Sequence, residues 1–167
     1  MMQTTKQVCV FGTHHAYQYQ TVRGKYCENV NALIEIYSVD LVAEEASGID
    51  RDTYAKKIAD ARKVSWKNVD LTSEERKPVP DINPRGLGTE IDFDLHSLRE
   101  WVWVIRTAKS MKQSAMLICG FAHLMGVASK FHSLGFVVAT EAYFDKADEK
   151  LIVERTEPEP AVDRIKP

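Results

Sequence analysis

Short apolar runs alternate along this chain with segments in which apolar residues recur every three or four positions. The runs are typical of buried strands, and the three-to-four spacing is typical of amphipathic helices. Strands followed by helices form right-handed crossovers, which make parallel sheets. We therefore expect a three-layer α/β fold with a mainly parallel central sheet. The pattern predicts strands at 7–12, 40–45, 64–71, 115–120 and 136–140, and helices at 21–37, 51–63, 94–110 and 124–134.

Residues that commonly begin or end helices set the expected limits of these elements. Asp94 is the predicted N-cap of its helix, and Gly135 is predicted to end the helix at 124–134. Residues 74–93 hold three prolines and two glycines among many charges, so we expect a long functional or mobile loop there. Residues 1–144 are predicted to form one domain, and 145–167 an edge extension followed by a disordered tail. The apolar face of the helix at 94–110 is predicted to comprise Leu95, Leu98, Trp101, Val102 and Ile105.

Composition narrows the functional classes. The 167 residues are 44% hydrophobic and 28% charged, with a formal net charge of −2, which is ordinary for a globular domain. Lysine and arginine are interspersed with acidic residues, so no basic surface for nucleic acid is expected. An apolar signal core and an apolar stretch of ~20 residues are both absent from the sequence, so we expect no membrane association. Cys9, Cys27 and Cys119 are far apart and are expected to be reduced, as in the cytoplasm.

The candidate chemistry lies where predicted strands end. A strand is followed by Gly-x-x-His twice, at residues 12–15 and 120–123, and the strand between them ends at Glu44 and Glu45. Ligands of parallel α/β sheets bind beyond the carboxyl ends of the strands. We therefore expect His15, His123 and one of the two glutamates, Glu44 or Glu45, to share a site. Neighbouring strand residues point to opposite faces, so only one of the glutamates can lie there.

Two kinds of chemistry suit such a site. Two imidazoles and a carboxylate can bind a divalent metal such as manganese, cobalt or zinc, which would activate a water. Without a metal, glutamate and histidine can act as general base and acid on a bound water that attacks an ester or amide. Tyr17 and Tyr19 either cover a pocket or simply pack. Arginines that could bind an anionic substrate or hold the carboxylate are Arg51, Arg76, Arg85 and Arg99, of which Arg99 and Arg51, with Tyr17, are the predicted substrate-binding residues.

The other chemically suggestive residues are expected to have structural roles. His14 is interpreted as a packed or solvated neighbour of His15, and His96 as a surface residue. His132 suits the negative end of its helix dipole. Trp101 and Trp103 are expected in the core and flank of one helix. Cys119 is expected to be an inert thiol within a buried strand.

Three segments together resemble the TraB/TIKI/erythromycin-esterase superfamily. They are the Gly-Thr-His-His run at 12–15, the strand at 40–45 that ends in glutamate, and the Gly-Phe-Ala-His-Leu run at 120–124. The resemblance spans most of the domain and implies that His15, Glu45 and His123 are the site residues. Known members include metal-dependent proteases, erythromycin esterases and haem-binding or pheromone-shutdown proteins. The chain is shorter than these members and lacks a helical insertion or membrane anchor. The run at 98–101 resembles a helix of small bacterial members, which makes Arg99 a candidate site residue.

The sequence thus predicts a small cytoplasmic hydrolase acting on a small-molecule or peptide substrate. One alternative is a ligand-binding or sensor protein that binds a metal, haem or an anionic metabolite without turnover. A second is a partner-binding component of a larger system, in which residues 74–93 and the acidic, proline-containing tail form the contact surfaces.

Overall fold

Five parallel strands form the centre of the molecule. The computed structural model describes residues 5–19, 25–46, 52–76 and 90–144, so the tail at 145–167 lies outside the described residues. The strands lie in the order β3-β2-β4-β1-β5, and every pairing is parallel. The strands are β1 (Gln7–Thr13), β2 (Leu41–Glu44), β3 (Ser65–Asn68), β4 (Ser114–Gly120) and β5 (Val137–Tyr143).

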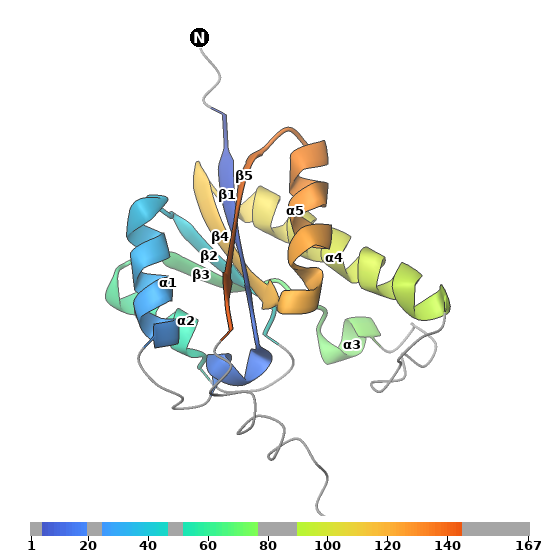
Figure 1. Cartoon of the computed structure of the whole chain (residues 1–167), viewed down its shortest axis with the longest axis horizontal. Helices are drawn as coiled ribbons and strands as arrows, with labels where there is room; N and C mark the ends of the chain where they lie inside the picture. Colours follow the sequence, from blue (N-terminus) through green and yellow to red (C-terminus); the bar gives the residue numbers. More distant parts are fainter. Residues whose placement is uncertain (1–4, 20–24, 47–51, 77–89, 145–167) are drawn as a thin grey trace, which may run out of the picture.

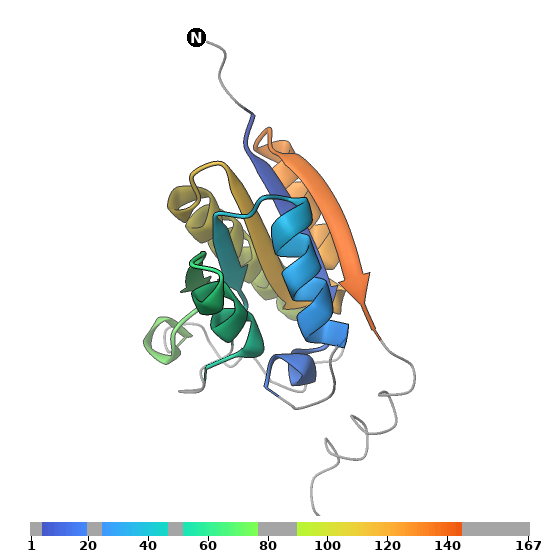
Figure 2. The same cartoon turned by 90° about the vertical axis from the view of Figure 1, so that its left-hand side faces the viewer.

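Helices cover both faces of this sheet. On one face lie α1 (Lys25–Ile36) and α2 (Tyr54–Ala61), and on the other lie α4 (Glu90–Ser110) and α5 (Leu124–Ser133) (Figures 1 and 2). The expected three-layer α/β fold is therefore confirmed. No helix in the described ranges is long and apolar enough to cross a membrane.

Strand alternation divides the core into two clusters. Along β1, Val8 and Val10 belong to the cluster that contains α4 and α5 residues, whereas Cys9 and Phe11 belong to the cluster that contains α1 and α2 residues. The inner strands are buried on both faces, which explains why their sequences are continuously apolar rather than alternating. We call these clusters the α4/α5 side and the α1/α2 side of the sheet.

The predicted loop at 74–93 is wrong at both ends, and residues 77–89 lie outside the described range. A short helix, α3 (Ser73–Arg76), follows a capping box: the Glu75 backbone N–H donates to Thr72 Oγ1, and the Thr72 N–H donates to Glu75 Oε2. The next helix begins at Glu90, so Asp94 is not its N-cap.

The predicted apolar face of α4 is wrong at Leu98 and Ile105, whereas Trp101 packs against the core as expected. Leu98 and Ile105 are 54% and 44% exposed, whereas the buried positions are Glu100, Trp103, Val104 and Thr107. Glu100 is buried on this side because it pairs with His123 and Lys130, and Trp103 because its Nε1 donates to Asp70, so apolar spacing alone does not define the buried face. Elsewhere the elements differ from prediction by a few residues, and Gly135 has the positive φ of +81° expected of a helix-ending glycine.

Candidate functional site at the carboxyl edge of the sheet

The two predicted histidine motifs follow neighbouring strands whose chains diverge. β1 pairs with β4, and both end in a short 3-10 turn, η1 (His15–Gln18) after β1 and η2 (Phe121–His123) after β4. The chain then enters α1 on one face and α5 on the other (Figure 1). Strand ends at which the connections leave in opposite directions are the usual ligand-binding position in open α/β sheets. His15 and His123 both lie at this position.

Gly120 brings three strand ends together. Its backbone N–H donates a hydrogen bond of 2.9 Å to Glu45 Oε2, which joins the end of β4 to the end of β2. The ring of His15 lies against the same glycine, because a Cβ atom there would be 2.7 Å from His15 Nε2. His15 Nε2 is 3.7 Å from Glu45 Oε2. The structure therefore brings His15 and Glu45 side by side.

Glu45 rather than Glu44 lies among these groups. Glu44 is fully buried on the α1/α2 side, where its carboxylate accepts hydrogen bonds from Thr53 Oγ1 and Trp66 Nε1. Burial raises the pKa of Glu44 to about 7, although these hydrogen bonds lower it. The two glutamates thus have separate environments on opposite faces of the sheet.

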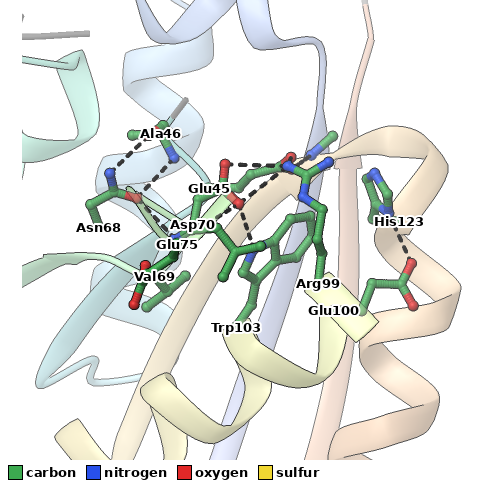
Figure 3. Close-up of polar contacts among 12 residues, drawn as sticks. Glu45, Ala46, Asn68, Val69, Asp70, Glu75, Arg99, Glu100, Trp103 and His123 are labelled. Atoms are coloured by element: carbon green, nitrogen blue, oxygen red, sulfur yellow. Dashed lines mark hydrogen bonds and ion pairs between the residues drawn. The ribbon is translucent and has the colours of Figure 1, made fainter. Parts of the chain in front are cut away.

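Arg99 of α4 holds two carboxylates in place (Figure 3). Its Nη2 donates to Glu45 Oε1 at 3.0 Å and to both carboxylate oxygens of Asp70 at 3.2 Å. Asp70 also accepts from Trp103 Nε1 at 3.0 Å, and the Arg99 guanidinium lies over the Trp103 ring. Both carboxylates are almost fully buried, so the guanidinium offsets the repulsion between two buried negative charges. Of the two roles considered for this arginine, the structure shows it holding carboxylates, and its contact with a substrate stays a prediction.

His123 is fixed by a separate carboxylate. Its Nδ1 lies 2.8 Å from Glu100 Oε1, and Lys130 Nζ donates to Glu100 Oε2 at 2.7 Å. Burial alone would raise the pKa of Glu100, but the hydrogen bonds from His123 and Lys130 outweigh it and lower that pKa. Glu100 is therefore ionised at neutral pH and is available to orient the imidazole.

Three side chains on one face of α4 contact His123. His96 stacks on the imidazole with ring centroids 5.0 Å apart, and Trp103 meets it edge-on at the same distance. Together with Glu100 they occupy positions spaced four and three residues apart, which share one helix face. His96, Glu100, Trp103 and Asp70 were not predicted to belong to the site. The spacing of the first three was visible in the sequence, but nothing in it indicated that they face His123.

Other residues singled out from the sequence have simpler environments. Tyr17 is fully buried on the α1/α2 side, where its ring packs against Tyr26 and Tyr143. His14 accepts a hydrogen bond from the Ala16 N–H and begins η1. Burial raises the pKa of the Cys119 thiol well above its usual value, as suits an inert thiol. Arg51 and Arg85 lie outside the described residues, and Arg76 lies in α3.

A divalent metal at His15, Glu45 and His123 stays a prediction. Each oxygen of Glu45 already accepts a hydrogen bond, one from Arg99 and one from Gly120. Within the part of the chain that the structure describes, no group of three or more His, Cys, Asp and Glu side chains could hold a metal ion. Because a carboxylate oxygen has two lone pairs, a metal at Glu45 would not have to displace the hydrogen bonds from Arg99 and Gly120.

We use the name strand-end site for His15, Glu45, Asp70, Arg99, Glu100 and His123. Four of them follow the ends of β1, β2, β3 and β4 in the chain, and Arg99 and Glu100 lie on α4. Comparison of the chain with family models, curated proteins and solved structures found no match.

Proposed function

We propose that the strand-end site belongs to a hydrolase that activates a water molecule against an ester or amide bond. The observation that carries the proposal is the meeting of three strand ends at Gly120, which puts the imidazole of His15 beside the carboxylate of Glu45. His123 follows three residues later and has a carboxylate partner of its own. Positioned imidazole and carboxylate groups are the usual means of proton transfer at neutral pH.

Acid/base chemistry requires a group that accepts a proton from water and a group that donates one to the leaving atom. Two histidines and Glu45 provide these groups, and Arg99 orients Glu45 through its hydrogen bond. The half-exposed His15 is accessible to a substrate, whereas Glu45 is buried behind it. The proposal includes the cytoplasmic location, the small-molecule or peptide substrate and the family resemblance inferred from the sequence.

The test is a hydrolysis screen with the purified chain on chromogenic esters and on peptide and amide substrates. His15→Asn, Glu45→Gln and His123→Asn are expected to lower kcat by about 100-fold or more, the usual contribution of a positioned acid or base. His132→Asn is the matched control, because His132 is exposed in the last turn of α5. Circular dichroism establishes that each variant is folded.

Elemental analysis of the same preparations tests the metal. Near-stoichiometric manganese, cobalt or zinc in the parent, lost in His15→Asn and His123→Asn, would support a metal-dependent reaction. Absence of turnover in the folded parent, with or without these ions, would overturn the hydrolase proposal, as would full activity in all three variants.

One observation favours the alternative of a ligand-binding protein. The carboxylates of Glu45 and Asp70 are hydrogen-bonded to Arg99 and other donors. Such an arrangement fixes the shape of a binding site and does not require a reaction. That function predicts tight binding of a small molecule, weakened by His15→Asn and His123→Asn, with no product formed.

A further inference from the structure

We infer that Glu100 and Lys130 are positioning residues that hold His123 in the Nδ1–H tautomer and leave its Nε2 as the proton-accepting atom of the strand-end site. The inference rests on the proposed function for its chemical consequence, and it deepens that function by assigning the general base to His123 rather than His15. The tautomer itself can be measured without a substrate.

The tautomer follows from which groups can donate. An ionised carboxylate only accepts hydrogen bonds, so the imidazole nitrogen that faces it at 2.8 Å carries the proton. In His123 this nitrogen is Nδ1, and in a neutral ring Nε2 then has a free electron pair on the side away from Glu100. Figure 3 shows His123 directed toward Glu100 through one edge of its ring.

Lys130 keeps the carboxylate ionised and in place. Its ammonium donates to Glu100 Oε2 at 2.7 Å, while His123 occupies Oε1, so each oxygen has one donor. The Lys130 and Glu100 side chains are both largely buried, which makes their attraction stronger than that of a surface pair. The three side chains come from α4, α5 and η2, and therefore tie together the elements on the α4/α5 side of the site.

The position of Glu100 also depends on a close helix contact. Gly126 of α5 faces the carboxylate, and a Cβ atom at this glycine would lie 2.7 Å from Glu100 Oε1. Such an approach is shorter than real side chains allow, so the glycine leaves the space that the carboxylate occupies. His96 and Trp103 restrict the plane of the His123 ring, since both pack on it at 5.0 Å between centroids.

His15 lacks this arrangement. Its Nδ1 is 3.4 Å from Gln18 Oε1 and its Nε2 is 3.7 Å from Glu45 Oε2, so an oxygen lies near each nitrogen and neither contact is short. The His15 side chain is also 45% exposed, whereas His123 is buried. Of the two histidines, His123 is therefore the one with a single defined proton-accepting atom, as a general base requires.

Imidazole ¹⁵N chemical shifts measured by NMR at neutral or mildly basic pH report the tautomer directly. We expect His123 of the parent to be mainly the Nδ1–H form. Glu100→Leu, which removes the acceptor, should abolish this preference, and Glu100→Gln, which keeps an acceptor oxygen without the charge, should retain part of it. Lys130→Met should weaken the preference, whereas Lys109→Met, at an exposed lysine in the last turn of α4, should not.

His14 provides an internal reference in the same spectra. Its Nδ1 accepts the Ala16 N–H at 3.1 Å, so it must be the Nε2–H tautomer, and none of these substitutions touches it. Parallel kinetics should show kcat reduced about 10- to 100-fold in Glu100→Leu with KM little changed, and an intermediate kcat in Glu100→Gln.

The outcomes separate the two proposals. An Nε2–H tautomer of His123 in the parent, or a tautomer unchanged in folded Glu100→Leu, overturns the positioning role. Should Glu100→Leu not fold, an unchanged tautomer in Glu100→Gln and Lys130→Met overturns it instead. If the tautomer depends on Glu100 but the parent hydrolyses nothing, the positioning role stands and the hydrolase proposal fails.

Discussion

Gly120 is the residue on which the geometry of the site depends most. Its N–H binds Glu45 and its α-carbon is covered by the His15 ring, so it contacts the ends of β2 and β1 at once. The separation of 2.7 Å between a hypothetical Cβ and His15 Nε2 is closer than real Cβ contacts. Only glycine therefore allows His15 to lie against the end of β4.

Gly120→Ala should displace His15 with little loss of stability. The His15 side chain is half-exposed and can swing into solvent, so we expect the free energy of unfolding to fall by no more than about 1 kcal/mol. Hydrolytic activity or ligand binding should fall together with a change in the His15 NMR signals. Gly135→Ala is the opposite control: at φ +81° it should cost stability of about 1 kcal/mol and leave the site unchanged. Full activity in Gly120→Ala would contradict the role given to this contact.

The two glutamates at the end of β2 show what the sequence predicts about single side chains and what it leaves open. Alternation requires Glu44 and Glu45 to face opposite sides, and it was the basis for expecting only one of them at the site. The sequence does not show which of the two glutamates faces which side of the sheet. The preceding residues Leu41, Val42 and Ala43 are all apolar and buried, so neither side of the strand is marked by polar residues. The family resemblance indicates Glu45, and the structure places this carboxylate beside His15.

At the scale of elements, α4 supplies polar groups to the site from its buried face. Arg99, Trp103 and Arg106 contact Asp70, and His96, Glu100 and Trp103 contact His123. Each set has the three-or-four spacing of one helix face. The sequence predicts the helix, but its apolar spacing does not identify the face that is buried against the sheet. Pairing of polar side chains with distant partners leaves no local signal.

Arg99→Met should destabilise the protein strongly. The substitution leaves the carboxylates of Glu45 and Asp70 buried and without their shared cation, which typically costs about 3–5 kcal/mol. Urea denaturation measures the loss. Addition of Asp70→Asn should recover part of it by removing one charge, and Arg62→Met, which breaks a pair with the exposed Glu35, should cost no more than about 1 kcal/mol. A loss below about 1 kcal/mol for Arg99→Met would show that the carboxylates do not need the guanidinium.

At the scale of the whole molecule, sequence predicts the layers better than the strand order. The alternation of strands and helices is enough for a parallel three-layer fold. The insertion of β4 between β2 and β1 is a long-range feature, since β4 follows them in the chain by many residues. Because β4 lies next to β1, the second Gly-x-x-His motif lies next to the first, although the two are far apart in the sequence.

Opposite ends of the sheet carry acidic groups whose pKa values move in opposite directions. At the amino edge, Asp40 accepts backbone N–H groups of Lys112, Gln113 and Ser114 and so ties β2 to β4. Burial would raise the pKa of Asp40, but these hydrogen bonds lower it overall. At the carboxyl edge, burial raises the pKa of Glu44 to about 7. The stability of the fold should therefore respond to pH through both groups.

We expect the free energy of unfolding to fall as pH rises from about 4.5 to about 7. The folded chain binds a proton at Glu44 more tightly than the unfolded chain, so the stabilisation is complete below the unfolded pKa of 4.5 and is lost as pH rises through the folded value. The shift corresponds to a change on the order of 3 kcal/mol. Asp40 has the opposite sign: its contribution is present above the unfolded pKa of 3.8 and is lost as pH falls through the lower folded value.

Urea denaturation across this range, in the parent, Glu44→Gln and Asp40→Asn, separates the two contributions. His14 also contributes to the pH dependence: burial and the neighbouring His15 lower its pKa, so it favours the folded state at higher pH. The difference between the parent and Glu44→Gln cancels this background because both proteins contain the same histidines. That difference should decline between about pH 4.5 and pH 7 and then level off, whereas Asp40→Asn should lose stability at neutral pH and abolish the loss in acid. A difference that stays constant across the window would mean that Glu44 is charged in the folded protein, and the buried environment on the α1/α2 side would then have to contain a compensating cation.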